Sequence, residues 1–125
     1  MLLLIAVLAA TDPRTLLAGT WKGESICTKV RPGCRNEIAV YHISVPDKPG
    51  VVDLVANKVI HGKEVEMGGT LEFKVNSDAT TLVADIDFGE NHIEFAFTRS
   101  GKKLVGKLID RSNGAVVRNM RLKKD

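Results

Sequence analysis

Turn-forming residues recur at short, regular intervals along most of the chain, and this spacing constrains the fold more than any other feature. Gly, Pro, Asn and Asp gather between runs that are rich in Val, Ile, Leu and Phe, and no 3.6-residue apolar period is found beyond residue 20. Short strands separated by tight turns are typical of an all-β barrel or sandwich. We predict eight strands, over residues 20–30, 36–45, 51–60, 64–75, 81–88, 91–99, 102–110 and 115–123.

The alternation of side chains predicts how the central strands pair. If Gly89-Glu90 forms a two-residue turn, Ile86 faces Ile93 and Ala84 faces Phe95. Successive side chains point to opposite faces of a strand, so this register places the apolar residues of both strands on one face. A slip of one residue would turn these apolar residues outward, and the register is therefore well specified.

Two further hairpins follow from the same reasoning. A turn at Ser100-Gly101 predicts that Phe97 faces Leu104, again with apolar residues on a common face. A three-residue loop in the last hairpin predicts that Leu108 faces Arg118. This register places a lone arginine on the interior face.

Eight sequential antiparallel strands predict an up-and-down barrel, because closure removes the exposed edges of a sheet. The strands 36–45 and 51–60 carry apolar and polar residues on both faces, so alternation does not show which of their residues point inward. A barrel of eight strands is wide enough either to be filled by side chains or to hold one small ligand.

The apolar run Leu2–Ala10 is too short to span a bilayer and matches the apolar region of a secretory signal. We therefore predict a signal peptide over residues 1–10 and a single barrel domain over 11–125, secreted or periplasmic and without a stable membrane anchor. The alternative is an N-terminal helix that packs over one end of the domain.

Two cysteines, Cys27 and Cys34, flank the turn-forming segment Arg31-Pro32-Gly33. An even number of cysteines behind an apparent secretion signal favours a disulfide, which would close the end of a hairpin. The alternative is a pair of free thiols in a cytoplasmic protein. Two cysteines alone would supply only half of a zinc site.

Composition and motifs exclude several classes of function. The net charge of +3 is spread over mixed signs, and aromatic residues make up 5% of the chain, which argues against nucleic-acid binding. The three histidines, His42, His61 and His92, accompany no recognisable nucleophile motif. We therefore predict no enzyme activity and no cofactor.

One outward patch carries potential metal ligands, namely Asp85, Asp87, His92 and Glu94. Glu94 also faces Lys107 in the predicted register, and this cross-strand pair is a sufficient reason for its charge. We therefore predict no metal site.

The segment Gly19-Thr20-Trp21, the eight-strand meander and a basic residue in the last strand together resemble the lipocalin-like, or calycin, superfamily. This resemblance implies that Trp21 sits at the closed end of the barrel. It also implies that an arginine near the C-terminus, Arg118 or Arg121, packs across the indole.

The inward residues form the first candidate site, a small apolar pocket in which Arg118 would anchor an anionic head group. The alternative for this site is a solid core. The residues predicted to bind a small apolar or amphipathic ligand are Met67, Leu71, Phe73, Ile86, Phe95, Phe97, Arg118 and Met120.

A second hypothesis is a barrel that binds a protein, as lysozyme or peptidase inhibitors do. The loop closed by Cys27 and Cys34 would then be the working surface, because a rigid loop loses less entropy on binding.

Overall fold

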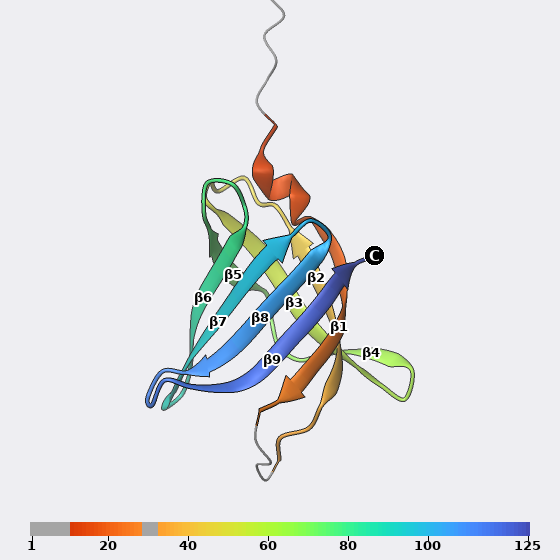
Figure 1. Cartoon of the computed structure of the whole chain (residues 1–125), viewed down its shortest axis with the longest axis vertical. Helices are drawn as coiled ribbons and strands as arrows, with labels where there is room; N and C mark the ends of the chain where they lie inside the picture. The colour runs from red at the N-terminus through yellow and green to blue at the C-terminus, as the bar shows by residue number, and fades with distance from the viewer. Residues whose placement is uncertain (1–10, 29–32) are drawn as a thin grey trace, which may run out of the picture.

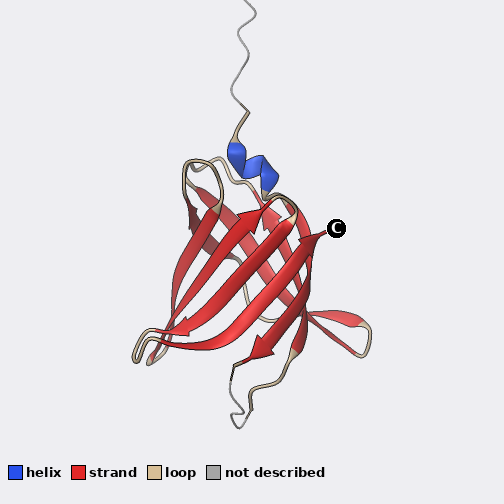
Figure 2. Cartoon of the chain, viewed as in Figure 1, coloured by secondary structure: helices blue, strands red, loops and turns tan. Residues whose placement is uncertain are grey.

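The computed structural model describes residues 11–28 and 33–125, so the predicted signal peptide at 1–10 and the residues Lys29–Pro32 lie outside the described residues. It is an all-β structure with one short helix (Figure 2). Within these ranges, no helix is long and apolar enough to cross a membrane. The elements are η1 (Pro13–Leu16), β1 (Gly19–Cys27), β2 (Glu37–Ser44), β3 (Val51–Ile60), β4 (Lys63–Glu66), β5 (Leu71–Val75), β6 (Thr81–Phe88), β7 (Asn91–Ser100), β8 (Lys103–Asp110) and β9 (Ala115–Lys124).

Eight of the strands form a closed antiparallel barrel, as predicted (Figure 1). Around the ring, each strand pairs with the next strand in the chain, except that β3 is followed in the ring by β5 because β4 lies outside it. The pairing of β1 with β9 closes the ring. Closure leaves the ring without a free sheet edge along most of its circumference.

The expected strand over 64–75 is wrong, because the structure divides it into β4 and β5. β4 pairs with the second half of β3, outside the ring, whereas β5 pairs with the first half of β3, within the ring. Between them lies the segment from Met67 to Thr70, which contains two adjacent glycines. Glycine inside a strand pattern favours a bend, and here the bend separates two strands. The hairpin of β3 and β4 projects from the side of the barrel (Figure 1).

The hairpin registers agree with the sequence in two of three cases. Ile86 faces Ile93, and Leu108 faces Arg118, as predicted. The register of β7 and β8 is wrong by two residues, because Phe97 faces Gly106 rather than Leu104. A shift of two residues keeps the same side chains on the inner face, so the predicted parity is retained.

The end of the barrel covered by η1, drawn at the top of Figure 1, is filled by a closed apolar core. Trp21 is fully buried, and its Nε1 donates a hydrogen bond of 2.8 Å to the carbonyl oxygen of Leu17. Phe73, Phe97 and Tyr41 belong to the same core, and the ring of Phe97 lies 5.7 Å from that of Phe73 and 5.8 Å from that of Tyr41 between centroids. Full burial of such side chains contributes about 2–3 kcal/mol each before entropy is counted.

The helix η1 lies across this end (Figure 1), and its Arg14 bonds to a neighbouring loop. The Arg14 guanidinium forms an ion pair of 2.7 Å with Asp12. Its Nη1 also donates to the carbonyl oxygens of Pro46, Lys48 and Val51, which precede and begin β3. These contacts join the start of the described chain to the loop between β2 and β3.

The cation beside the indole differs from the expected one. The Nζ atom of Lys124 lies 5.8 Å from the centre of the Trp21 ring. Arg121 pairs with Glu24 and is exposed, and Arg118 pairs with Cys27 at the far end of β1. The expectation of a barrel-closing Arg118 or Arg121 is therefore corrected, since strand register places Lys124 opposite Trp21.

Candidate functional site

An apolar cavity of about 200 Å³ lies in the lower half of the barrel. Its walls come from strands that are far apart around the ring, chiefly β3, β7 and β8, together with the segment between β4 and β5. The lining residues are Ala56, Met67, Gly68, Gly69, Leu71, Ile93, Phe95 and Leu108.

The cavity lies where the ring is weakest. β5 and β6 share only two paired positions, Lys74 with Val83 and Val75 with Leu82. Beyond these positions, residues 84–88 of β6 pair with β7 on one side and with no described strand on the other. Because β4 leaves the ring, the segment with Gly68 and Gly69 borders this gap instead of a strand. The departure of β4 thus leaves room for the cavity.

The seven apolar residues among the predicted ligand-binding residues divide between the cavity and the core. Met67, Leu71 and Phe95 line the cavity, and Met67 is 44% exposed at its rim. Phe73, Phe97 and Met120 are buried in the closed core, and Ile86 is partly buried against it. The sequence thus predicts a single inward set, whereas the structure divides these residues between a filled upper half and a hollow lower half.

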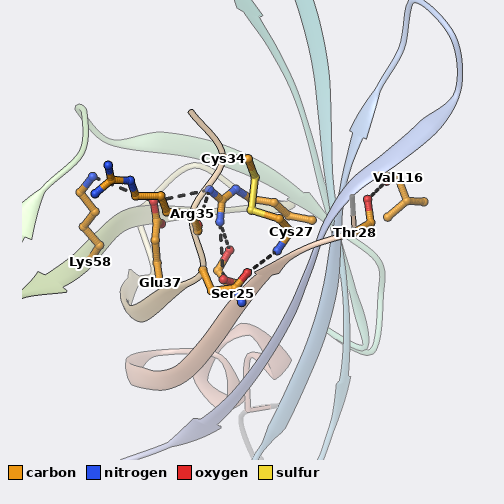
Figure 3. The surroundings of a disulfide bond; sticks show 10 residues. Ser25, Cys27, Thr28, Cys34, Arg35, Glu37, Lys58 and Val116 are labelled. Carbon is orange, nitrogen blue, oxygen red and sulfur yellow. Dashed lines mark hydrogen bonds and ion pairs between the residues drawn. A yellow bond between two sulfur atoms is a disulfide. The ribbon is translucent and has the colours of Figure 1, made fainter. Parts of the chain in front are cut away.

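A charged cluster of Arg118, Glu37 and Lys58 lies at the lower end of the barrel beside the disulfide, where Figure 3 labels Glu37 and Lys58. Glu37 Oε1 lies 3.6 Å from Arg118 Nη2 and 4.0 Å from Lys58 Nζ. Arg118 also donates from Nη1 to Ser25 Oγ over 3.1 Å and from Nη2 to the carbonyl oxygen of Arg35 over 2.9 Å. The lone interior arginine predicted from register is therefore part of a larger charged group.

Tyr41 belongs to the apolar core and lies on the same face of β2 as Glu37, four positions further along the strand. It is 3% exposed and pairs across the sheet with Ala56, which lines the cavity. Burial, assisted by the negative charge of Glu37 and opposed by Arg118, raises the pKa of the phenol far above its ordinary value. The hydroxyl of Tyr41 is thus held in its protonated form, which can donate a hydrogen bond.

The predicted disulfide is present between Cys27 and Cys34 (Figure 3). The backbone N–H of Cys27 donates to Asn36 Oδ1 over 2.9 Å, which ties the two sides of the loop together. The bond indicates an oxidising environment, because cytoplasmic thiols are normally kept reduced. It also fixes the segment that carries the Arg35 carbonyl oxygen toward Arg118.

The outward acidic patch is an ion-pair network. Arg111 Nη1 lies 3.0 Å from Asp85 Oδ1 and 2.8 Å from Glu94 Oε2, while Asp87 bonds to His92. Glu94 faces Ile109 rather than the predicted Lys107, because of the two-residue shift between β7 and β8. Arg111 therefore replaces Lys107 as the partner that accounts for the charge of Glu94.

A second outer-face group holds the projecting hairpin against the barrel. The Glu64 carboxylate of β4 accepts a hydrogen bond of 2.8 Å from Asn57 Nδ2 and also bonds to His42 Nε2. His42 Nδ1 in turn lies 3.1 Å from the hydroxyl of Thr20. These bonds lower the pKa of Glu64, Asn57 having the largest effect and His42 the next.

Sequence reasoning missed Glu37, Lys58 and Ala56 as site residues. All three belong to strands with apolar and polar residues on both faces, so alternation alone does not identify their inward side. The signal that would have found them is pairing with a strand of known parity, here Leu71 of β5 opposite Leu54 of β3.

Comparison of the chain with protein-family models and with curated proteins yields no match. The barrel geometry and its side chains therefore carry the functional argument.

Proposed function

We propose that this protein is an exported, lipocalin-like barrel that binds a small apolar or amphipathic molecule in the lower cavity. The observation that carries the proposal is the cavity itself, an apolar space of about 200 Å³ inside the barrel. Ligand sites are concave and mostly apolar, with a few polar groups that set orientation. The polar part is supplied by the cluster of Arg118, Glu37 and Lys58, since Leu108 of the cavity wall is the cross-strand partner of Arg118.

The size of the cavity limits the ligand. An apolar cavity of roughly 150 Å³ accommodates a benzene-sized molecule. A volume of about 200 Å³ therefore suits one aromatic ring or a short alkyl chain. A longer chain would have to extend past Met67 into solvent.

Two features support export. The disulfide between Cys27 and Cys34 is favoured outside the cytoplasm, and the apolar run Leu2–Ala10 has the character of a secretory signal. Native mass spectrometry of the protein from its own host tests this part of the proposal. Loss of the apolar run together with two hydrogens would support it, whereas a full-length reduced chain would contradict it.

The binding function is tested by filling the cavity. Ala56 lines the cavity and is only 9% exposed, so Ala56→Leu places extra carbon atoms in the space that a ligand would occupy. Titration calorimetry with 1-octanol should show binding to the unaltered protein and at least about tenfold weaker binding to the variant. The control is Val105→Leu, which adds one carbon atom at an outward position that is 50% exposed. Equal binding to all three proteins would contradict use of the cavity.

A second candidate is a protein-binding barrel acting through the disulfide loop. The observation that favours it is the pair of exposed isoleucines beside the loop, Ile26 at 41% and Ile38 at 57% exposure. An exposed apolar surface next to a loop closed by a disulfide is a feature of protein interfaces. Inhibition assays against a lysozyme and a serine peptidase test it. Inhibition that disappears on reduction of the disulfide would support this candidate, and no inhibition would remove it.

A further inference from the structure

We propose that the ligand of the lower cavity carries a single negative charge, as a carboxylate does, and that Arg118 and Lys58 bind this head group. This inference rests on the proposed binding function and names the class of molecule that the cavity takes. It divides the site into an apolar part for the tail and a polar part for the head.

The strand register connects the two parts. Leu108 lines the cavity and is the cross-strand partner of Arg118. Directly opposed residues have Cβ atoms about 5 Å apart, so the arginine stem begins beside the cavity wall. On the opposite wall, Lys58 follows the lining residue Ala56 by two positions and therefore shares its inward face. The two cations thus belong to the inner face just beyond the cavity, one on each side.

The two cations are incompletely neutralised. Both interact with the same atom, Glu37 Oε1, over 3.6 and 4.0 Å. Other ion pairs in the molecule are much closer, for example 2.7 Å between Arg14 and Asp12. One carboxylate shared at long range between two cations leaves one positive charge in excess, in a group whose side chains are only 17–32% exposed. Partial removal from water strengthens the attraction for an added anion.

Polar neighbours fit the same assignment. Ser25 Oγ accepts from Arg118 Nη1, and the carbonyl oxygen of Arg35 accepts from Nη2, so the guanidinium is already oriented. Tyr41 lies four positions after Glu37 on the same face of β2, and its protonated hydroxyl adds an uncharged donor on that face. An oriented guanidinium with further donors is a favourable arrangement for a carboxylate.

The test compares three probes with the same eight-carbon tail, namely octanoate, 1-octanol and octylammonium. Titration calorimetry at pH 7 should show octanoate binding roughly tenfold more tightly than 1-octanol, and octylammonium binding weakest. Lys58→Gln should weaken octanoate binding by about fivefold and leave 1-octanol binding unchanged. Glu37→Gln should have the opposite effect and strengthen octanoate binding, because it removes the competing carboxylate.

Two controls and three outcomes separate the possibilities. Lys103→Gln removes an exposed lysine at the other end of the barrel and should leave all three affinities unchanged. Thermal unfolding of each variant shows whether it is folded. Equal affinity for octanoate and 1-octanol, or weaker octanoate binding to the Glu37→Gln variant, would overturn the head-group assignment and leave the cavity function standing. Binding of none of the three probes would overturn both.

Discussion

The ammonium group of Lys124 lies over the buried indole of Trp21 and also donates to the carbonyl oxygen of Leu16, over 3.2 Å. One side chain near the C-terminus therefore holds both the plug of the barrel and the helix η1 that covers it.

Replacement of this lysine should destabilise the closed end. Lys124→Met keeps the aliphatic stem but removes the charge above Trp21, which is worth about 1 kcal/mol at a partly buried site. For a chain of this length the melting temperature should fall by about 3–5 °C. Lys123→Met changes an exposed lysine one residue earlier and should have little effect. Equal losses in both variants, measured by thermal unfolding, would assign the effect to net charge instead.

Gly23 should tolerate no side chain. A Cβ atom there would lie 1.8 Å from the carbonyl oxygen of Arg121, so β9 would have to move away from β1. We expect Gly23→Ala to lower the free energy of unfolding by about 3 kcal/mol or more. Gly69→Ala is the control, because its Cβ would meet no atom within 4 Å and its backbone is outside the left-handed region. Denaturant titration measures both, and similar losses would contradict the close approach of β1 and β9.

The disulfide should contribute measurably to stability despite its short loop. Its cysteines are separated by seven positions, for which loop entropy predicts about 2.5 kcal/mol. A Cys27→Ser, Cys34→Ser double variant should lose about this amount in denaturant titration. Reductant should destabilise the unaltered protein to the same level and leave the double variant unchanged. An effect of reductant on the double variant would show that another process is being measured.

The stabilising effect of Glu64 should depend on pH. Its pKa lies below the ordinary value of 4.5 because it accepts hydrogen bonds from Asn57 and His42. The folded protein therefore binds this proton more weakly than the unfolded chain does. The resulting stability is complete above the unfolded pKa and is lost as the pH falls through the folded one.

Denaturant titrations between pH 7 and pH 2.5 check this expectation with the Glu64→Gln variant. The unaltered protein should be more stable at neutral pH, and the difference should shrink toward the acidic end. Glu66→Gln, an exposed change on the same strand, should run parallel to the unaltered protein across the range. A constant difference for Glu64→Gln would mean that its carboxylate charge is not the stabilising feature.

The barrel could be predicted from sequence because alternation and turn residues act locally. The register of β6 and β7 follows from the two residues between them, Gly89 and Glu90. The register of β7 and β8 could not be obtained in this way, since moving the turn to Gly101 and Lys102 leaves the same side chains inside. Alternation distinguishes the two faces of a strand but not two registers that differ by two residues.

The site was less predictable than the barrel, because it depends on where the ring departs from regularity. The apolar alternation of Val65, Met67, Leu71 and Phe73 continues across Gly68-Gly69, so it gives no sign that β4 leaves the ring. The hollow lower half follows from that departure. The partners of Arg118 likewise depend on pairings between strands that are distant in sequence.

The limited pairing of β5 with β6 has a kinetic consequence. Separating these strands breaks two paired positions, whereas separating β6 from β7 breaks eight. Under the proposed function, a molecule can leave through this seam by local opening while the rest of the ring stays intact. The residence time of a bound molecule would then depend on the free energy of separating β5 from β6 and not on the free energy of global unfolding. Substitutions that raise the melting temperature elsewhere in the barrel should leave the dissociation rate unchanged.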